Sequence, residues 1–361
     1  MVLSSSRYYH RRMPEDTSGC ICKSTAMLYS HLESADSMES GFQRILMKLQ
    51  NDSQLRRAMC SLEGLSVGDA FGERYFVNPD VVDGLIEARA LAEPPWLFTD
   101  DTLMALSVVS SLHWCGEIDQ NLLAKSFAQR YDPSRGYGPS MHGVLARINE
   151  GEPWQDVTRS MFAGQGSFGN GAAMRVAPVG AYFADDLDAV VEQASLSAEI
   201  THAHEEAIAG AIAVAVAAAV AWNLGESASN PGRQDFLDMI LPYVPKSEVS
   251  GKIRQARDMA QDTSLQFAVA VLGNGVNVSA QDTVPFALWC AGECLDNFEE
   301  ALWLTVSGLG DRDTTCAMVG GIVAIYTGIE GIPKDWLAAR ELLPEWVFSE
   351  KISPEMNSTK G

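Results

Sequence analysis

Apolar residues recur three and four positions apart along most of the chain, which is the period of an amphipathic α-helix. Period-two alternation, which is typical of half-buried strands, is almost missing. The helical period marks residues 45–49, 59–65, 103–112, 122–127, 141–148, 154–162, 190–200, 207–224, 236–243, 253–259, 283–295, 298–306 and 314–329. Because a doubly wound α/β fold needs strands between its helices, the pattern predicts an all-α fold, a compact helical bundle.

The longest apolar run, residues 207–222, is rich in alanine, with nine alanines in sixteen residues. A membrane span needs about 20 residues that are more strongly apolar. Small side chains also allow neighbouring helices to approach from every side, so this run predicts a buried central helix. We expect a poorly ordered extension over residues 1–40, a single helical domain over 41–348 and a tail over 349–361.

Composition narrows the choice of partner and compartment. The chain of 361 residues carries 47 acidic and 26 basic side chains, a formal net charge of −21. Nucleic acids and anionic membranes need a basic face, so neither is the expected partner. Seven scattered cysteines and the lack of an apolar leader favour a reducing compartment. We therefore expect a cytoplasmic protein, most simply a monomer.

Two acidic turns lead directly into apolar helices, and each offers two carboxylates and a threonine hydroxyl. The first turn holds Thr99, Asp100 and Asp101, and the second holds Asp311, Asp313 and Thr314. Taken singly, the first turn is also explained as a plain helix N-cap and the second as a solvated turn. Taken together, their oxygen-only donors select hard cations such as Mg²⁺, and four acids brought close would repel one another without a cation. The pair of turns predicts a shared site for two ions.

Between these turns lies a glycine-rich segment, residues 162–175, with four glycines in eight residues. It matches G-x-G-x-x-G literally, but it follows a predicted helix and not a strand, which disfavours a dinucleotide-binding fold. Exposed backbone N–H groups in such a loop still suit a phosphate. Phe168 is either a stacking face for a base or a core aromatic residue. His202 is interpreted as a polar contact at a helix start, and Glu73 as either a general base or a solvent-facing side chain.

Five spaced motifs together resemble the ADP-ribosylglycohydrolase family: GDAFG, TDDT, GxGSFGNGAAMR, THAHEEAIAGA and GDRDTTCAMVGGI. The resemblance runs from about residue 65 to about residue 336. It implies an all-α domain, an orthogonal helical bundle of the ADP-ribosylglycohydrolase type. It also implies a binuclear Mg²⁺ site, with Mn²⁺ as the alternative ion, in a cleft that takes ADP-ribose. The implied activity is hydrolysis of the glycosidic bond between ADP-ribose and a modified protein side chain, with arginine favoured.

The resemblance also implies roles for individual residues. The metal ligands would be Thr99, Asp100, Asp101, Asp311, Asp313 and Thr314. The substrate-binding residues would be Phe162, Gly166, Ser167, Phe168, Gly169, Asn170, Gly171 and His202, with the two phenylalanines beside the adenine and His202 near the ribose. The catalytic residues would be Asp101 or Asp311, which orient and deprotonate the attacking water; Glu73 stays a candidate general base on the residues alone.

Two departures from the family pattern concern the general base and the linkage. Many members have an acid at the position of Phe76, whereas this chain has Glu73 three residues earlier. Some arginine-specific members have an aspartate in the loop that aligns with residues 136–141, and this chain has none there. A hydrolase of serine-linked or small ADP-ribose conjugates, or an inactive ADP-ribose-binding or structural relative, are therefore the alternatives. An isoprenoid synthase is disfavoured, because its aspartate-rich motif wants another acid near Met104.

Overall fold

The computed structural model describes residues 52–352. The expected extension over residues 1–40, the predicted helix over 45–49 and the end of the expected C-terminal tail lie outside this range.

Within residues 52–352 the regular elements are helices, and extended pairing is limited to two isolated bridges, Trp96 with Arg340 and Gly169 with Ser279. The α-helices are α3 (Ser53–Glu73), α4 (Pro79–Glu87), α5 (Asp100–Cys115), α6 (Gln120–Gln129), α7 (Pro139–Asn149), α8 (Trp154–Arg159), α9 (Met161–Gly164), α10 (Ala177–Tyr182), α11 (Leu187–Glu199), α12 (Glu205–Glu226), α13 (Arg233–Ile240), α14 (Glu248–Asp258), α15 (Leu265–Leu272), α16 (Ala280–Glu293), α17 (Phe298–Val306), α18 (Arg312–Thr327), α19 (Lys334–Ala339) and α20 (Trp346–Ser349). The 3₁₀ helices are η2 (Asn170–Ala172), η3 (Leu241–Tyr243) and η4 (Ile329–Gly331). The all-α prediction is confirmed.

The helices that the apolar period indicated are present in the described range. Their ends shift by up to three residues, except that α3 extends well beyond the predicted 59–65 at both ends and α14 begins before the predicted 253–259. The pattern did not indicate α4, α10, α15, α19 and α20, which have at most nine residues and so show too few turns for a period to stand out. The predicted helix over 154–162 was wrong at its end. Helix α8 stops at Arg159, and Phe162 and Ala163 have φ of 49° and 58°. These left-handed residues turn the chain into the glycine-rich loop.

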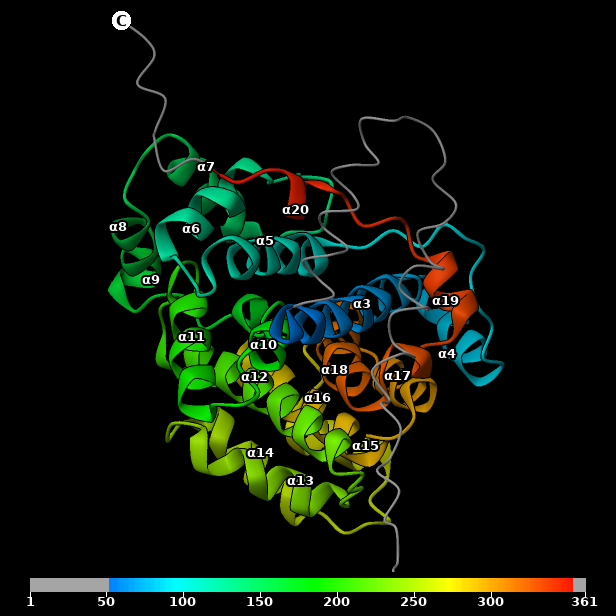
Figure 1. The fold of residues 1–361 in the computed structure, drawn as a ribbon. Coiled ribbons are helices and arrows are strands. Elements are labelled where there is room, and N and C mark those ends of the chain that lie inside the picture. Colours follow the sequence, from blue (N-terminus) through cyan, green and yellow to red (C-terminus); the bar gives the residue numbers. More distant parts are fainter. Residues whose placement is uncertain (1–51, 353–361) are drawn as a thin grey trace, which may run out of the picture. The chain divides into compact units, whose positions relative to one another are not determined.

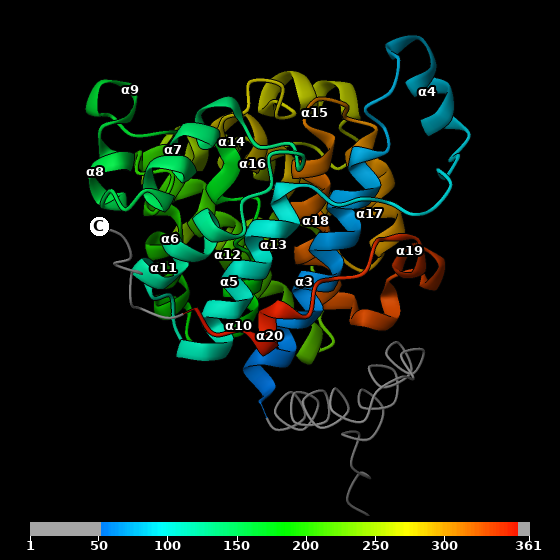
Figure 2. The ribbon, with the colours of Figure 1, turned by 90° about the horizontal axis from the view of Figure 1, so that it is seen from above.

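Helix α12 occupies the centre of the bundle, as its alanine content predicted. In Figures 1 and 2 it runs between α10, α11, α16 and α18, and it packs against all four. By length and composition α12 could cross a membrane, but 83% of its most apolar window is buried inside the protein. Burial of this kind is that of a core helix.

Helices α3 and α18 pack backbone to backbone (Figure 1). A Cβ atom on Gly64 would lie 2.3 Å from the carbonyl oxygen of Gly320, and one on Gly68 would lie 2.1 Å from that of Cys316. One turn further, a Cβ atom on Gly72 would lie 2.2 Å from the carbonyl oxygen of Arg312. Glycines four residues apart therefore give α3 a bare face, and this face brings the residues around Asp69 against the start of α18.

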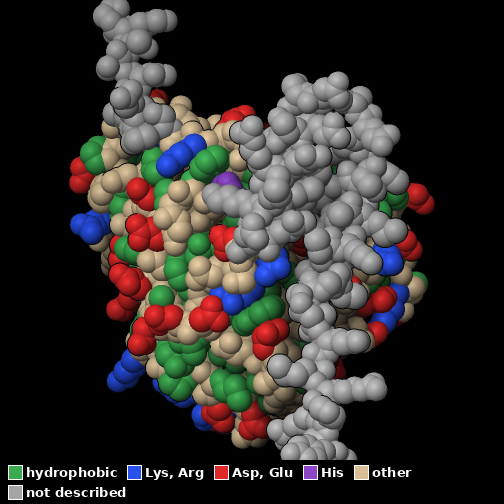
Figure 3. Space-filling view, in the orientation of Figure 1, with side chains coloured by type: hydrophobic (Ala, Val, Ile, Leu, Met, Phe, Trp, Pro, Cys, Tyr) green, Lys and Arg blue, Asp and Glu red, His purple; other side chains and the backbone are tan. Residues whose placement is uncertain are grey.

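The C-terminal half of α3 is also held by aromatic rings. Phe71 stacks on Trp336 of α19 with 4.6 Å between ring centroids, and it meets Trp303 of α17 edge to face at 5.0 Å. Such pairs add stability beyond the area that they bury. They fix the turn of α3 that carries Asp69. On the face drawn in Figure 3, acidic side chains are spread widely over the surface, in keeping with the net negative charge.

Candidate active site

Three carboxylates from three helices converge beside the glycine contacts of α3 and α18. Asp69 comes from α3, Asp101 from the first turn of α5 and Asp313 from the first turn of α18. One oxygen of each lies within 4.8 Å of one oxygen of each of the others. The two acidic turns that the sequence singled out thus meet in space, and Asp69 joins them as a third contributor.

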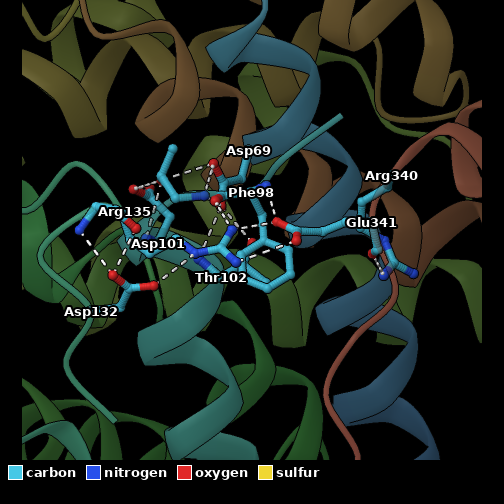
Figure 4. A network of polar contacts seen from close by, with 10 residues as sticks. Asp69, Phe98, Asp101, Thr102, Asp132, Arg135, Arg340 and Glu341 are labelled. Atoms are coloured by element: carbon cyan, nitrogen blue, oxygen red, sulfur yellow. Dashed lines mark hydrogen bonds and ion pairs between the residues drawn. The ribbon is translucent and has the colours of Figure 1, made fainter. Parts of the chain in front are cut away.

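Asp69 is fully buried and accepts four hydrogen bonds from the start of α5. The backbone N–H and hydroxyl of Thr99 each donate to it at 2.9 Å, and those of Thr102 donate at 3.1 and 2.5 Å. Figure 4 shows Asp69 facing Asp101 and Thr102. Asp69 therefore satisfies N–H groups that the first turn of a helix leaves without an intrahelical partner. It fixes α5 relative to α3.

Asp101 and Asp313 each keep one buried oxygen, Oδ1, without a hydrogen-bond partner in residues 52–352. The other oxygen of Asp101 lies 3.1 Å from the Thr99 hydroxyl and 3.5 Å from the Thr314 hydroxyl. A buried carboxylate oxygen without a partner costs free energy. An oxygen-coordinated divalent cation supplies the missing partner, so the residues present fit such an ion.

Electrostatics in the cluster also favour a cation. Burial raises the pKa of Asp69 to about 6, and burial followed by the charge of Asp69 raises the pKa of Asp100 to about 8. The pKa values of Asp101 and Asp313 are raised by burial and then by the neighbouring carboxylates. Like charges in a dry site oppose ionisation, and a bound cation reverses that effect.

The other acids predicted at the site surround these three but are not part of the group within 4.8 Å. Asp100 is buried, and its backbone N–H donates to the carbonyl oxygen of Arg135 at 2.7 Å. Asp311 accepts a 2.6 Å hydrogen bond from the amide of Asn170, and burial raises its pKa. Glu73 stands one turn beyond Asp69 on α3 and is partly exposed. Burial, and then the charge of Asp69, raise its pKa.

The glycine-rich loop is tied to the second acidic turn through Asn170. Its amide donates to the Thr283 hydroxyl at 3.0 Å as well as to Asp311. Both amide hydrogens of this predicted substrate-binding residue are therefore used within the protein. The loop is also attached to the start of α16, because Ala280 donates its N–H to the carbonyl oxygen of Phe168 at 3.0 Å.

The glycines of this loop allow a close approach to residues 202–204. Gly166 has φ of 76°, and a Cβ atom on it would lie 2.9 Å from the backbone nitrogen of His204. A Cβ atom on Gly171 would lie 2.7 Å from the imidazole ring of His202. Ser167 accepts the N–H of Gly169 at 3.2 Å, which tightens the turn. His202 is thus packed against the loop. The family resemblance had assigned both to the same substrate-binding site.

Two exposed aromatic rings lie beside the loop. Phe162 is 54% exposed and Phe168 is 41% exposed, and their ring centroids are 6.3 Å apart. Phe168 also meets His204 edge to face at 5.6 Å. Phe168 is therefore not a core residue, and both rings offer faces on which a planar base could stack.

A second network supports the segment that leads into α5 (Figure 4). The guanidinium of Arg135 donates to the carbonyl oxygen of Phe98 at 2.7 Å, stacks over the Phe98 ring and forms an ion pair with Glu341. Glu341 in turn accepts the N–H of Phe98 at 2.9 Å. These contacts hold the residues just before Thr99, so the first acidic turn is anchored from both sides.

Asp69 is the residue that sequence reasoning missed. It stands inside the GDAFG motif, but nothing in its sequence neighbourhood separates it from an ordinary polar residue in a helix. The available signal was the spacing of Gly64, Gly68 and Gly72, which predicts a bare helix face in close contact with another helix. Asp69 directly follows one of those glycines, so it lies beside the bare face and points toward the start of α5.

The all-helical fold gathers carboxylates at the first turns of two helices, next to a glycine-rich loop, and this cluster could hold a metal ion. The family model of ADP-ribosylglycohydrolase matches residues 50–356, so the chain belongs to the ADP-ribosylglycohydrolase family. ADP-ribosylhydrolase ARH3 of Homo sapiens is 31% identical over 330 residues, which cover 78% of this chain and 88% of that protein.

Two further similarities support the family and the fold. An uncharacterised protein of Archaeoglobus fulgidus is 33% identical over 316 residues, which cover 81% of this chain and 93% of that protein. A solved structure described as an ADP-ribosylglycohydrolase-related protein complex superposes with a TM-score of 0.59 at 24% identity, covering 80% of this chain and 93% of that one. The predicted fold type is confirmed, and family membership supports an ADP-ribosyl hydrolase.

Proposed function

We propose that the protein is a Mg²⁺-dependent hydrolase that uses two ions to release ADP-ribose from a modified protein side chain. The observation that carries the proposal is the convergence of Asp69, Asp101 and Asp313 within 4.8 Å of one another. Two of these carboxylates have buried oxygens without a hydrogen-bond partner in the described part of the chain. Such a cluster is costly in a folded protein unless it binds a cation.

The residues that would hold the ions are Thr99, Asp100, Asp101, Asp311, Asp313 and Thr314, supported by Asp69. Mg²⁺, when bound, supplies positive charge that polarises the oxygen atoms it contacts. Asp101 or Asp311 orients the attacking water and takes its proton. Glu73, on the same face of α3 as Asp69, is a second candidate for that proton transfer.

The nucleotide would occupy the glycine-rich loop. Backbone N–H groups of Ser167 and Gly171 suit the diphosphate, whereas those of Gly166 and Gly169 donate to Met161 and Ser167 and shape the turn. Phe168 and Phe162 offer their exposed faces to the adenine. We therefore expect the glycosidic bond to lie between the loop and the acidic cluster, which Asn170 joins through its hydrogen bond to Asp311.

A linkage-resolved hydrolysis assay tests the proposal. The purified chain is incubated with ADP-ribosyl-arginine and ADP-ribosyl-serine peptides, each with Mg²⁺ or with EDTA. We expect ADP-ribose release only with Mg²⁺, and fastest from arginine, the linkage that the sequence favours. Asp101→Asn should abolish release, whereas Asp235→Asn, an exposed acid on α13, should leave it unchanged.

The alternative is a relative that binds ADP-ribose without turnover. Tight binding of ADP-ribose with no release from either peptide in the presence of Mg²⁺ or Mn²⁺ would favour that alternative. Absence of both binding and release would overturn the assignment altogether.

A further inference from the structure

A buried arginine lies behind the glycine-rich loop, outside the acidic cluster. Arg175 follows η2 and is fully buried. Its guanidinium donates to the carbonyl oxygens of Gly171 at 3.1 Å and Ser197 at 2.9 Å, and to the Thr201 hydroxyl at 2.8 Å. The ring of Phe127 lies 4.4 Å from its central carbon. Arg175 therefore connects the loop to the segment between α11 and α12.

Thr201 links Arg175 to His202 through its hydroxyl group. The Thr201 hydroxyl oxygen lies 2.7 Å from Nδ1 of His202, and Thr201 is itself fully buried. A guanidinium has five N–H donors and no acceptor, so Arg175 can only donate to Thr201. The hydroxyl has one hydrogen, and Nδ1 of His202 is the acceptor within reach of it. Thr201 therefore donates to Nδ1.

This direction fixes the tautomer of His202. If Nδ1 carried the proton, it would donate to Thr201, and the Thr201 hydrogen would be buried with no acceptor. When Nδ1 accepts, the Thr201 hydroxyl is fully used, because it accepts from Arg175 and donates to His202. A neutral imidazole that accepts at Nδ1 carries its proton on Nε2.

Burial also keeps His202 neutral. Burial, and then the positive charge of Arg175, lower the pKa of His202 to about 3. The same burial lowers the pKa of Arg175 only to about 9, so the arginine remains charged near neutral pH. The donor chain is therefore the same over the whole range from weakly acidic to weakly basic pH.

The free side of the imidazole faces the glycine-rich loop. A Cβ atom on Gly169 would lie 3.1 Å from Nε2 of His202, and one on Gly171 would lie 3.0 Å from it. Nε2 has no hydrogen-bond partner among residues 52–352, and His202 retains 5% exposure. The two glycines thus let the loop backbone approach the Nε2 edge of the ring with no side chain between them.

We propose that Arg175 and Thr201 are positioning residues that lock His202 in the Nε2–H tautomer, so that His202 donates a permanent hydrogen bond to an oxygen of bound ADP-ribose. This inference rests on the proposed function for its ligand. His202 then contributes to binding and takes no part in proton transfer. The class of ligand atom is an acceptor oxygen, either of the diphosphate or of a ribose hydroxyl.

Long-range ¹H–¹⁵N spectra of the histidine rings test the tautomer directly, without ligand. The His202 signals are identified by their loss in His202→Gln. We expect the Nε2–H pattern in the wild-type protein, unchanged between about pH 6 and about pH 8. An Nδ1–H pattern, or protonation of the ring within that range, would overturn the inference. This measurement needs no variant of the donor chain to fold.

Thr201→Val removes the hydroxyl and keeps the shape of the side chain. We expect mixed tautomers and about tenfold weaker binding of ADP-ribose, measured by calorimetry. Thr201→Ser should restore both readouts. Ser197→Ala is the matched control, because the Ser197 hydroxyl has no partner within the described residues whereas its backbone carbonyl still accepts from Arg175.

The two proposals fail in different ways. If the wild-type protein binds no ADP-ribose, the proposed function is overturned. If the wild-type protein binds ADP-ribose and folded Thr201→Val binds it equally well with the same tautomer, only the positioning role is overturned.

Discussion

The hydroxyl of Thr102 donates a 2.5 Å hydrogen bond to the carboxylate of Asp69, across the contact between α5 and α3. Thr102 also donates its backbone N–H to the same carboxylate. Asp69 thus positions the first turn of α5 and contributes charge to the acidic cluster at the same time. A substitution of Asp69 therefore tests this positioning and this charge without removing any of the side chains that would bind the ions directly.

Asp69→Asn should weaken Mg²⁺ binding without unfolding the protein. The amide keeps the shape of the carboxylate, but it cannot accept from all four donors of α5. Loss of a group that orients metal ligands costs about 10–100-fold in metal affinity. Calorimetric titration with Mg²⁺ measures the change, with Asp235→Asn as the control. An unchanged affinity would show that Asp69 does not support the metal site.

The raised carboxylate pKa values predict that the metal-free protein loses stability as pH rises. Asp69 and Asp100 have pKa values of about 6 and about 8 in the folded chain, against an ordinary value of 3.8. From the ordinary pKa of 3.8 up to each raised pKa, the folded state binds more protons than the unfolded state. The free energy of unfolding therefore falls as pH rises from about 4 to about 8.

Thermal unfolding in EDTA and in Mg²⁺ measures this effect. In EDTA we expect Tm to be lower at about pH 8 than at about pH 5. Mg²⁺ should raise Tm more at the higher pH, because the ligands must be deprotonated to bind it. A Mg²⁺ effect that is equal at both pH values, or greater at the lower one, would contradict the assignment of these acids as ligands.

Asn170→Ala should detach the glycine-rich loop from the second acidic turn. The variant loses the hydrogen bonds to Asp311 and Thr283, so we expect about tenfold weaker binding of ADP-ribose, or about 1.4 kcal/mol. Asn170→Asp should bind more weakly still, because it sets a second carboxylate against Asp311. Asn223→Ala removes a comparable amide contact, with Ala184, and should leave binding unchanged.

Gly68→Ala should push α3 away from α18. The added methyl group would lie 2.1 Å from the carbonyl oxygen of Cys316, and backbone cannot move aside cheaply. We expect a loss of about 1–3 kcal/mol in the free energy of unfolding and a smaller rise of Tm with Mg²⁺. Gly84 lies in α4, and a Cβ atom added there would meet no other residue's atoms within 4 Å. Gly84→Ala should therefore stabilise the protein by about 0.5–1 kcal/mol. Equal effects of the two substitutions would contradict the role of the glycine contact.

The apolar period was sufficient to predict the longer helices and the central place of α12, because a helix that is apolar all round can only be satisfied by burial. Local chemistry was also sufficient to single out Thr99, Asp101 and Asp313, since clustered oxygen donors at helix starts are recognisable without coordinates. The motifs then indicated the family. These properties depend on residues that lie close together in the chain.

Tertiary structure decided which carboxylates share a site. Asp69 lies 32 positions before Asp101 and 244 before Asp313, and only the contacts of α3 with α5 and with α18 bring the three together. The same holds for the turn at Phe162, where left-handed backbone ends a helix that the apolar period would continue. Arg175 and His202 became one unit only through Thr201. Distances between such residues depend on helix packing, and a linear pattern carries no record of which faces will meet.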